Sequence, residues 1–274
     1  MTVDMTGKHC VVTGGSGGIG QAIARRLVAK GARVTILARD TPRLAAAASG
    51  CGAAALPCDL ARLSEVRRAA EQLSGSRIEV LVLNAAIIAP TRKLTVDGIE
   101  TTLAVNHLAP YLLTRLLLPQ LAPAARIVVL GADPRMLSRT PVDLDNLQSE
   151  RAFSSSGSYM RSKNMNIMFA YALARRLGNS GILVNAAHPG VIRTDLASNT
   201  TGLLRFMTTI ARPFVPDADT GADTPYWLAS SAEVTTTGGF FKRRRRQATA
   251  GHTLDLARQE ELWRKSAQLV GLDA

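Results

Sequence analysis

The sequence has few cysteines, no long apolar run and no signal peptide. Its 274 residues include three cysteines, Cys10, Cys51 and Cys58, an odd number without the spacing of metal ligands. We therefore expect free thiols in a reducing cytoplasm and no metal site. No run of about eighteen apolar residues occurs, which excludes an ordinary transmembrane helix. The N-terminus lacks the long apolar core of a signal peptide, so we expect a soluble, cytoplasmic protein.

Acidic residues are also scarce: 21 Asp and Glu stand against 33 Lys and Arg, for a net charge of +12. Five cations form the run KRRRR at residues 242–246. Such a run suits an acidic partner, such as a nucleic acid, an anionic lipid or an acidic carrier protein. We favour a solvated basic loop, because the run lacks the interleaved aromatic residues of a nucleic-acid groove. No nucleic-acid partner is expected.

What the sequence does contain is a regular alternation of strands and helices. Hydrophobic residues make up 46% and charged residues 20%, as in ordinary soluble proteins. Short apolar runs such as HCVVTGG, ARVTILAR and ARIVVLG alternate with amphipathic segments such as GIGQAIARRLVAKGA. Continuously apolar strands are buried on both faces, which indicates a parallel sheet between helices. The sequence predicts an α/β fold, a single Rossmann-type domain over residues 1–274 with a doubly wound, mostly parallel sheet.

A glycine-rich turn follows the first predicted strand and opens the first helix. In TGGSGGIG, Gly14, Gly18 and Gly20 have the spacing G-x-x-x-G-x-G. Glycines at this spacing let the backbone turn tightly and approach a pyrophosphate at the helix N-terminus. The turn predicts a dinucleotide-binding site.

The residue that ends the second strand predicts which dinucleotide binds. Arg39 lies where an acidic residue would accept hydrogen bonds from the 2′-hydroxyl of NAD. A cation there favours a 2′-phosphate, and so NADP(H); the alternative is a surface arginine beside Asp40. After the third strand, Asp59 is expected either to accept from the adenine amino group or to cap the helix that begins near ARLSEV.

The motif YMRSK contributes Tyr159 and Lys163, one helical turn apart on one face. A nearby ammonium favours the charged form of a phenol and is expected to lower its pKa from about 10 by ~1–3 units. Such a tyrosine can pass a proton to or from a carbonyl oxygen. Together with the glycine turn, the pair predicts proton transfer beside a bound dinucleotide.

On these motifs the chain resembles the short-chain dehydrogenase/reductases, and most of all their retinol-dehydrogenase-like branch. TGGSGGIG resembles the cofactor loop of that family, and LNAA resembles its N-N-A-G signature with Leu83 and Ala86 as departures. VNHLAPYLLT carries the expected asparagine, and YMRSK matches the Y-x-x-x-K pair. NAAHPGVIRTDL resembles the Pro-Gly turn, and ELWRKSAQLVGL resembles the branch's C-terminal helix, so the likeness covers nearly the whole chain.

The resemblance implies a role for each matching residue. Tyr159 would exchange the proton, Lys163 would lower its pKa and hold the nicotinamide ribose, and Asn106 would anchor a water that links Lys163 to solvent. Asn84 would close the cofactor pocket, and Thr194 would hold the nicotinamide carboxamide. The implied cofactor-binding residues are Gly14, Ser16, Gly18, Ile19, Gly20, Arg39, Asp59, Leu60, Asn84, Ala85, Lys163, Pro189, Gly190, Val191 and Thr194.

The family's catalytic serine is missing from the end of the fifth strand. In RIVVLGADPR, Gly131 and Ala132 stand at the positions of the usual serine pair. Loss of one donor to a developing oxyanion typically lowers the rate by ~10²–10³. A substitute is expected from Asp133 with a raised pKa, a backbone N–H, Ser138, or the SSSGS run at residues 154–158. The alternative for that run is a flexible polar loop before the helix.

The segment after Thr194 is where this family varies to fit substrates. Residues 195–225 are expected to form a lid, in which LLRFMTTIARPFV at 203–215 is apolar and carries two arginines. The lid would suit a bulky lipophilic substrate with an acidic group. The same segment also suits a helix packed on the domain, a dimer contact or an anionic membrane surface. A C-terminal helix is expected at about 253–270.

The sequence therefore predicts an NADP(H)-dependent oxidoreductase that interconverts a carbonyl and an alcohol on a bulky hydrophobic molecule. Retinoids, steroids and polyketides all fit, and the Ala- and Arg-rich composition suggests a bacterium of high G+C, which favours a ketoreductase of secondary metabolism. The alternative is a redox-silent member of the same fold that catalyses cyclisation, dehydration or isomerisation, or that regulates by binding cofactor. The Gly131-Ala132 pair supports the alternative, and a homo-oligomer is left open.

Overall fold

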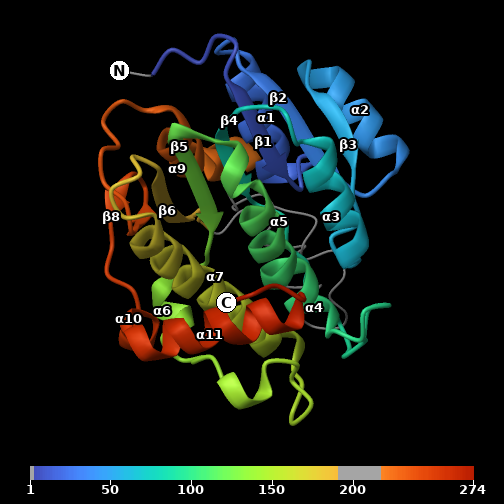
Figure 1. Cartoon of the computed structure of the whole chain (residues 1–274), viewed down its shortest axis with the longest axis vertical. Coiled ribbons are helices and arrows are strands. Elements are labelled where there is room, and N and C mark those ends of the chain that lie inside the picture. The colour runs from blue at the N-terminus through green and yellow to red at the C-terminus, as the bar shows by residue number, and fades with distance from the viewer. Residues whose placement is uncertain (1–2, 191–216) are drawn as a thin grey trace.

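A computed structural model describes residues 3–190 and 217–274, drawn in colour in Figure 1. Within these residues, eight strands form one sheet in the order β3-β2-β1-β4-β5-β6-β7-β8. The strands from β3 to β7 are parallel, and β8 is antiparallel to β7. They are β1 (His9–Thr13), β2 (Arg33–Ala38), β3 (Ala54–Pro57), β4 (Ile78–Leu83), β5 (Leu121–Leu130), β6 (Leu183–His188), β7 (Gly239–Lys242) and β8 (Arg245–Arg246).

Helices cover both faces of the sheet, so the molecule has three layers (Figure 1). Each face buries its own apolar cluster against its helices. One face carries α1 (Gly18–Val28), α2 (Pro42–Cys51) and α9 (Ala218–Ser230). The other carries α3 (Leu63–Gln72), α5 (Ala109–Leu117), α7 (Ser155–Leu177) and α11 (Leu256–Leu269). Short elements are α4 (Thr101–Leu103), the π-helical turn η1 (Ala104–Leu108), η2 (Leu118–Gln120), α6 (Pro134–Leu137), η3 (Leu144–Asn146) and α10 (Gly251–Leu254).

This architecture confirms the predicted doubly wound, mostly parallel sheet. All five residues of β1 are buried, which explains why its sequence is apolar without alternation. The chain passes from β1 to β2 and β3 on one side and from β4 onward on the other, so the strand order reverses between β1 and β4. In open sheets of this kind, ligands bind outside the carboxyl ends of the strands at that reversal.

The serine run at 154–158 begins a helix and is not a loop. Ser154 is the N-cap of α7, and its side chain accepts a hydrogen bond from the Gly157 backbone N–H. The other serines lie in the first turn. A serine oxygen satisfies an N–H that has no partner inside the helix, which is why serine is favoured at this position. The expectation of a flexible polar loop is wrong for this reason.

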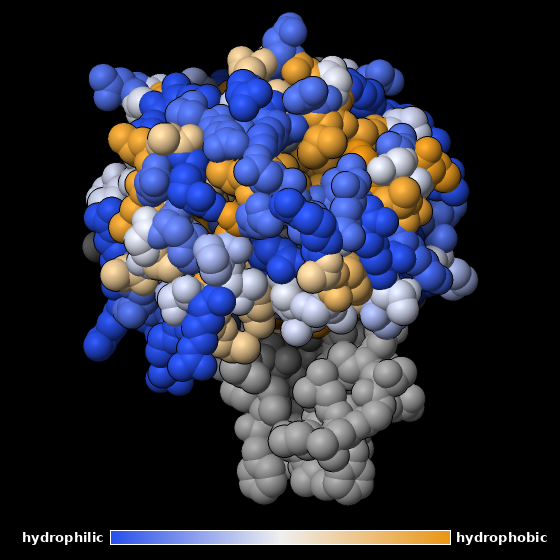
Figure 2. Space-filling view, turned by 90° about the horizontal axis from the view of Figure 1, so that it is seen from below, coloured by the Kyte–Doolittle hydropathy of each residue, from blue (hydrophilic) through white to orange (hydrophobic). Residues whose placement is uncertain are grey.

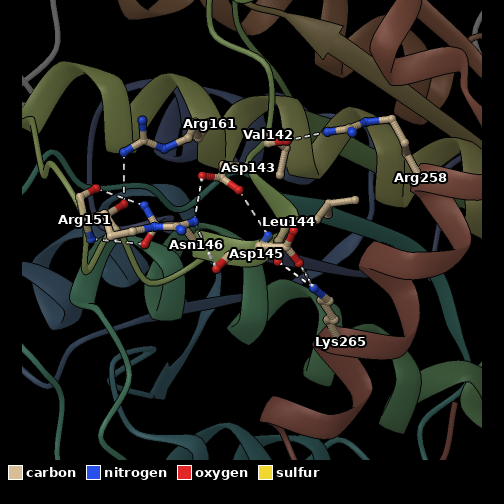
Figure 3. Close-up of polar contacts among 10 residues, drawn as sticks. Val142, Asp143, Leu144, Asp145, Asn146, Arg151, Arg161, Arg258 and Lys265 are labelled. Atoms are coloured by element: carbon tan, nitrogen blue, oxygen red, sulfur yellow. Dashed lines mark hydrogen bonds and ion pairs between the residues drawn. The ribbon is translucent and has the colours of Figure 1, made fainter.

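The C-terminal helix α11 packs across α5 and α7. Trp263 stacks on Phe169 and meets Tyr111 edge-on, with ring centroids 5.9 and 5.0 Å apart. Lys265 donates to the Leu144 carbonyl at 2.8 Å, and Arg258 donates to the Val142 carbonyl, so α11 also fastens the segment around η3 (Figure 3). Helix α11 occupies most of the range in which a C-terminal helix was expected.

Only part of the expected lid belongs to the described residues. Residues 195–216 lie outside them, and residues 218–225 form the first part of α9. Among the described residues, no helix has the length and apolar character needed to cross a membrane. On the side of α11, hydrophilic and apolar side chains are intermixed, as on ordinary protein surfaces (Figure 2). The three cysteines are buried and free, as expected from their number.

The basic run at 242–246 forms the hairpin of β7 and β8. Arg243 and Arg244 occupy its two-residue turn with φ of 51° and 58°, a conformation that asparagine and glycine adopt more readily. Lys242 contacts Asp133 and Arg244 contacts Asp223. The run is therefore a hairpin and not a loop, and Lys242 is only partly exposed, whereas Arg243, Arg244, Arg245 and Arg246 are exposed as expected.

Candidate active site

A cleft of about 810 Å³ lies at the carboxyl ends of the parallel strands, where the strand order reverses. Among the described residues, it brings together most of the residues expected to bind cofactor or substrate. These are Gly14, Ser16, Gly18, Ile19, Arg39, Asp59, Leu60, Asn84, Ala85, Tyr159, Lys163, Pro189 and Gly190. Gly20 and Asn106 lie behind the wall of the cleft. Val191 and Thr194 lie outside the described residues.

The glycine turn after β1 has the geometry of an anion cradle. Gly14 and Gly18 have φ of 69° and 53°, which favours glycine at both positions. A Cβ on Gly14 would lie 2.9 Å from the Ala85 Cα, and one on Gly20 would overlap the Gly14 carbonyl. Helix α1 begins directly after the turn without a side-chain cap. Its first N–H groups therefore remain available to an anion.

Asn84 braces this turn from the end of β4. Its side-chain amide donates to the carbonyls of Thr13 and Gly14 at 2.9 and 3.3 Å. The Thr13 hydroxyl in turn accepts from the backbone N–H groups of Asn84 and Ala85 at 3.0 and 3.1 Å. Thr13 was missed by sequence analysis, although its place directly before the glycines was a signal. Together these bonds join the ends of β1 and β4 on the floor of the cleft.

Two arginines, Arg39 and Arg43, also line the cleft. Arg39 is exposed at the end of β2, as expected from the sequence. Arg43, on α2, also lines the cleft, and its Nε donates to the Ser16 carbonyl at 3.0 Å. A Cβ on Gly17 would overlap the Arg43 guanidinium, so this glycine leaves room for it. Sequence analysis missed Arg43, because only the fold brings the start of α2 over the glycine turn.

Asp59 lies on the cleft wall but does not cap helix α3. Its carboxylate accepts from the Ala61 backbone N–H at 3.0 Å, within the turn that precedes the helix. The N-cap position of α3 belongs to Arg62. The helix-cap interpretation is wrong because the turn delays the helix by three residues. A role toward the adenine stays a prediction.

Tyr159 and Lys163 face the cleft from α7, as their spacing predicted. The Lys163 side chain is almost fully buried, and its Nζ donates to the Leu130 carbonyl at 3.2 Å. Nζ lies 5.6 Å from the centre of the Tyr159 ring. Burial lowers the pKa of the Lys163 ammonium to about 8 and raises the pKa of the Tyr159 phenol to about 12.

The expectation that Lys163 lowers the pKa of Tyr159 is therefore wrong for the protein without ligand. The Lys163 ammonium is directed at the Leu130 carbonyl, and loss of solvent dominates the titration of the phenol. At neutral pH the phenol keeps its proton. Tyr159 is accordingly suited to donate a proton to a carbonyl oxygen.

Asn106 contacts helix α7 from behind the cleft. It lies in the π-helical turn η1, a feature that often marks functional sites. Its amide accepts from the Ile87 N–H at 2.8 Å and donates to the Ile87 carbonyl at 2.9 Å and to the Ser162 hydroxyl at 3.0 Å. Ser162 then donates to the Tyr159 carbonyl at 2.6 Å. Anchoring of a water by Asn106 stays a prediction.

A second set of hydrogen bonds, centred on Glu100, also holds the start of α7 and was not predicted from the sequence. Glu100 is fully buried, and its carboxylate accepts from the N–H groups of Thr102 and Leu103 at 2.8 Å. The Ser158 hydroxyl donates to the same carboxylate at 3.3 Å. Ser158 directly precedes Tyr159, so the start of α7 is tied to the start of α4. Ser158 and Ser162, one helical turn apart, thus tie the start of α7 to Glu100 and Asn106 on either side of Tyr159 in the sequence.

Comparison with known proteins agrees with this geometry. The family model for enoyl-(acyl carrier protein) reductase matches residues 14–241. A putative daunorubicin C-13 ketoreductase from Streptomyces is 37% identical over 97% of this chain and 94% of its own length. Human retinol dehydrogenase 12 is 33% identical over 98% of this chain and 88% of its own length. The chain belongs to the short-chain dehydrogenase/reductase family.

Solved structures with the same fold also match this chain. A protein from Mycobacterium paratuberculosis matches with a TM-score of 0.83 and 31% identity, over 99% of this chain and 96% of its own. A short-chain dehydrogenase from Burkholderia cenocepacia, crystallised with NADP, matches with a TM-score of 0.69 and 28% identity, over 92% of this chain and 100% of its own. This short-chain dehydrogenase/reductase therefore belongs to a family of oxidoreductases.

The two residues that follow β5, Gly131 and Ala132, offer no hydroxyl, and their match to the family's serine pair stays a prediction. Gly131 and Ala132 line the cleft, and the Gly131 N–H already donates to the Ala187 carbonyl at 2.8 Å. Ser138 is exposed and donates to the Arg135 carbonyl. Within the described chain, neither Ser138 nor the serines of residues 154–158 line the cleft. None of these serines is placed to replace the missing donor.

Asp133 cannot act as a protonated substitute. Hydrogen bonds from Arg135, then from Lys242 at 2.6 Å, hold the pKa of the Asp133 carboxyl well below its usual range despite burial. Asp133 could have served as a donor only with a raised pKa, and this condition is not met, because Arg135 and Lys242 both contact its carboxylate. His188, at the end of β6, also lines this part of the cleft and was missed.

Because the Lys163 ammonium is buried, we expect it to lower the free energy of unfolding of the protein. The ordinary pKa is 10.5 and the folded value is about 8, so the folded protein binds fewer protons between these values. Its stability therefore rises with pH across that window. We expect Lys163→Met to raise the free energy of unfolding at pH 7 by ~2 kcal/mol, at ~1.4 kcal/mol per pKa unit less the lost hydrogen bond.

Urea unfolding at pH 7 and pH 10 measures this effect. The matched control is Lys265→Met on α11, since the carboxylates of Asp145 and Glu261 raise the pKa of Lys265 and the same change there should not stabilise. A Lys163→Met protein less stable than the parent at pH 7 would contradict the assigned cost.

Proposed function

We propose that this chain is an NADP(H)-dependent reductase that interconverts a carbonyl and an alcohol on a bulky hydrophobic substrate. One observation carries the proposal. The same cleft is lined by the Tyr159–Lys163 pair, by the glycine turn, and by Arg39 and Arg43. A proton donor and a phosphate-binding end within one cleft suit a reaction that couples a dinucleotide to a carbonyl oxygen.

The residues present suit NADP(H). The uncapped start of α1 and the positive φ of Gly14 and Gly18 suit a pyrophosphate. Two guanidinium groups border the end where a 2′-phosphate would lie, and no acidic residue ends β2. When bound, NADP(H) supplies or accepts the hydride. Relatives crystallised with NADP and with NADPH support the choice.

The proton is handled by residues of this chain. The Tyr159 phenol, protonated at neutral pH, gives its proton to the carbonyl oxygen as that oxygen becomes a hydroxyl. The Lys163 ammonium, with its pKa near 8, provides positive charge beside the phenolate that is left. Asn106 and Glu100, through Ser162 and Ser158, keep α7 in register while the charge moves.

The substrate class rests on the walls of the cleft and on the relatives. Ala86, Ile87, Ile88, Met136 and Met160 line the cleft beside Tyr159. Such walls favour a large apolar molecule. The relatives named as a daunorubicin ketoreductase and as retinol dehydrogenases support bulky hydrophobic substrates, among which polyketide-like ketones are the proposed class.

The cofactor assignment predicts a preference for NADPH over NADH that depends on two arginines. Arg39→Asp and Arg43→Ala should each weaken NADPH binding by about tenfold, since a charge-assisted hydrogen bond contributes ~1.5–3 kcal/mol and exposure reduces it. NADH binding should change little. Calorimetric titration measures both affinities. Arg264→Ala, an exposed arginine on α11, is the control. Equal affinity of the parent for the two cofactors would contradict the assignment.

The proton assignment predicts that Tyr159→Phe lowers kcat by ~10²–10⁴ and leaves the NADPH dissociation constant nearly unchanged. The phenol contacts the reacting oxygen, while the glycine turn and the arginines hold the cofactor. Tyr171→Phe is the matched control, because Tyr171 lies on the same helix and bonds Thr249 outside the cleft. Turnover of a ketone and aldehyde panel is followed by NADPH absorbance. If the Tyr159→Phe protein kept most of the turnover of the parent, Tyr159 would not be the proton donor.

Because Gly131 and Ala132 offer no hydroxyl, the same NADPH assay also tests the redox-silent alternative. A parent that binds NADPH tightly and consumes none with any carbonyl of the panel would favour cyclisation, dehydration, isomerisation or regulation by cofactor binding.

A further inference from the structure

His188 occupies the position beside the missing serine. It is the last residue of β6, and the preceding residue, Ala187, accepts a hydrogen bond from the Gly131 N–H. Its neighbour on the other side is Lys242, its register partner on β7. His188 is 6% exposed and lines the cleft that also contains Ala132 and Tyr159.

Both ring nitrogens of His188 are buried, and neither has a hydrogen-bond partner in the structure described. Buried polar atoms in folded proteins almost always have a partner, so an orphaned pair beside a cleft indicates a bound water or ligand. Burial, followed by the Lys242 ammonium, lowers the pKa of the imidazole to about 4. The imidazole ring is therefore neutral at pH 7, where one ring nitrogen is a hydrogen-bond donor and the other is an acceptor.

The surroundings of the ring favour one tautomer. The Asp133 carboxylate oxygen Oδ2 lies 3.9 Å from His188 Nε2 and is held by Lys242 at 2.6 Å and Arg135 at 3.2 Å. Its negative charge favours a proton on Nε2. Nδ1 is then left as a hydrogen-bond acceptor. An acceptor at this place requires a hydroxyl or an N–H from the ligand.

We propose that His188 positions the substrate by accepting a hydrogen bond from a hydroxyl beside the reacting carbonyl, so that hydroxy ketones are the preferred substrates. The inference rests on the proposed function. A ketone anchored through its neighbouring hydroxyl is oriented toward Tyr159 without a serine on the carbonyl oxygen.

A matched pair of ketones tests the assignment in the full chain with NADPH. The probes are 2-hydroxyacetophenone and acetophenone, which differ by one hydroxyl next to the carbonyl. His188→Leu should lower kcat/KM for 2-hydroxyacetophenone by about threefold to tenfold, the worth of one neutral hydrogen bond, and change acetophenone less than twofold. His188→Gln should restore part of the loss, because its amide oxygen accepts.

The control is His252→Leu on α10, since His252 also has a buried, unpartnered Nε2 but lies outside this cleft. It should leave the ratio of the two ketones unchanged. An equal loss on both ketones in His188→Leu would assign His188 a structural role. No change on either would overturn the inference as well.

Nitrogen NMR decides the inference without turnover. The chain has four histidines, so the His188 imidazole is assigned by its loss in His188→Gln. With NADP⁺ present, 2-hydroxyacetophenone should shift the Nδ1 resonance of an Nε2-protonated ring, and acetophenone should not. If no carbonyl is reduced, the proposed function fails while this shift still supports the hydroxyl contact. Identical spectra with both ketones would overturn the contact, whatever the turnover.

Discussion

The buried ammonium of Lys163 is the constraint around which the site is arranged. Its Nζ donates to the Leu130 carbonyl at the end of β5, so α7 must lie against the carboxyl ends of the parallel strands. Tyr159 then faces the same cleft one turn earlier. The hydrogen bonds of Asn106 and Glu100 with Ser162 and Ser158 keep that turn in place. A buried charge without this framework would take up solvent or lose its proton.

The sequence was sufficient for the features that depend on local pattern. Continuously apolar strands predict a parallel sheet, and a glycine turn between β1 and α1 predicts the cradle that Gly14 and Gly18 form. The four-residue spacing of Tyr159 and Lys163 is enough to place both on one face of a helix. These inferences succeed because period and spacing determine geometry within a single element.

The features that were missed depend on residues far apart in the chain. Asp133 is ionised because Lys242, brought from β7, lies 2.6 Å away, and no local pattern contains that contact. The pKa of Tyr159 rises because the folded chain removes solvent from the phenol, whereas spacing reveals only the nearby lysine. Arg43 and His188 reach the cleft through the packing of α2 and the register of β6. The pKa values of these groups, and contacts between residues far apart in the chain, can therefore be predicted only once the fold is known.

The charged side chains near Gly131 and Ala132 balance one another. Asp133 lines the same cleft as Tyr159, and an unpaired carboxylate there would oppose a developing oxyanion. Lys242 and Arg135 pair with it at 2.6 and 3.2 Å, and the His188 ring beside it is neutral. For the proposed reductase, this arrangement suits substrates that carry their own hydrogen-bonding group.

The central claim is that this cleft couples hydride transfer to proton transfer on a carbonyl. The most direct measurement uses NADPH with deuterium at the transferable position of the nicotinamide, followed by mass spectrometry and NMR of the product. The account predicts one deuterium at the carbinol carbon of the product alcohol for each NADPH oxidised. A product without deuterium, formed while the cofactor stays reduced, would contradict the account and assign the fold to redox-silent chemistry.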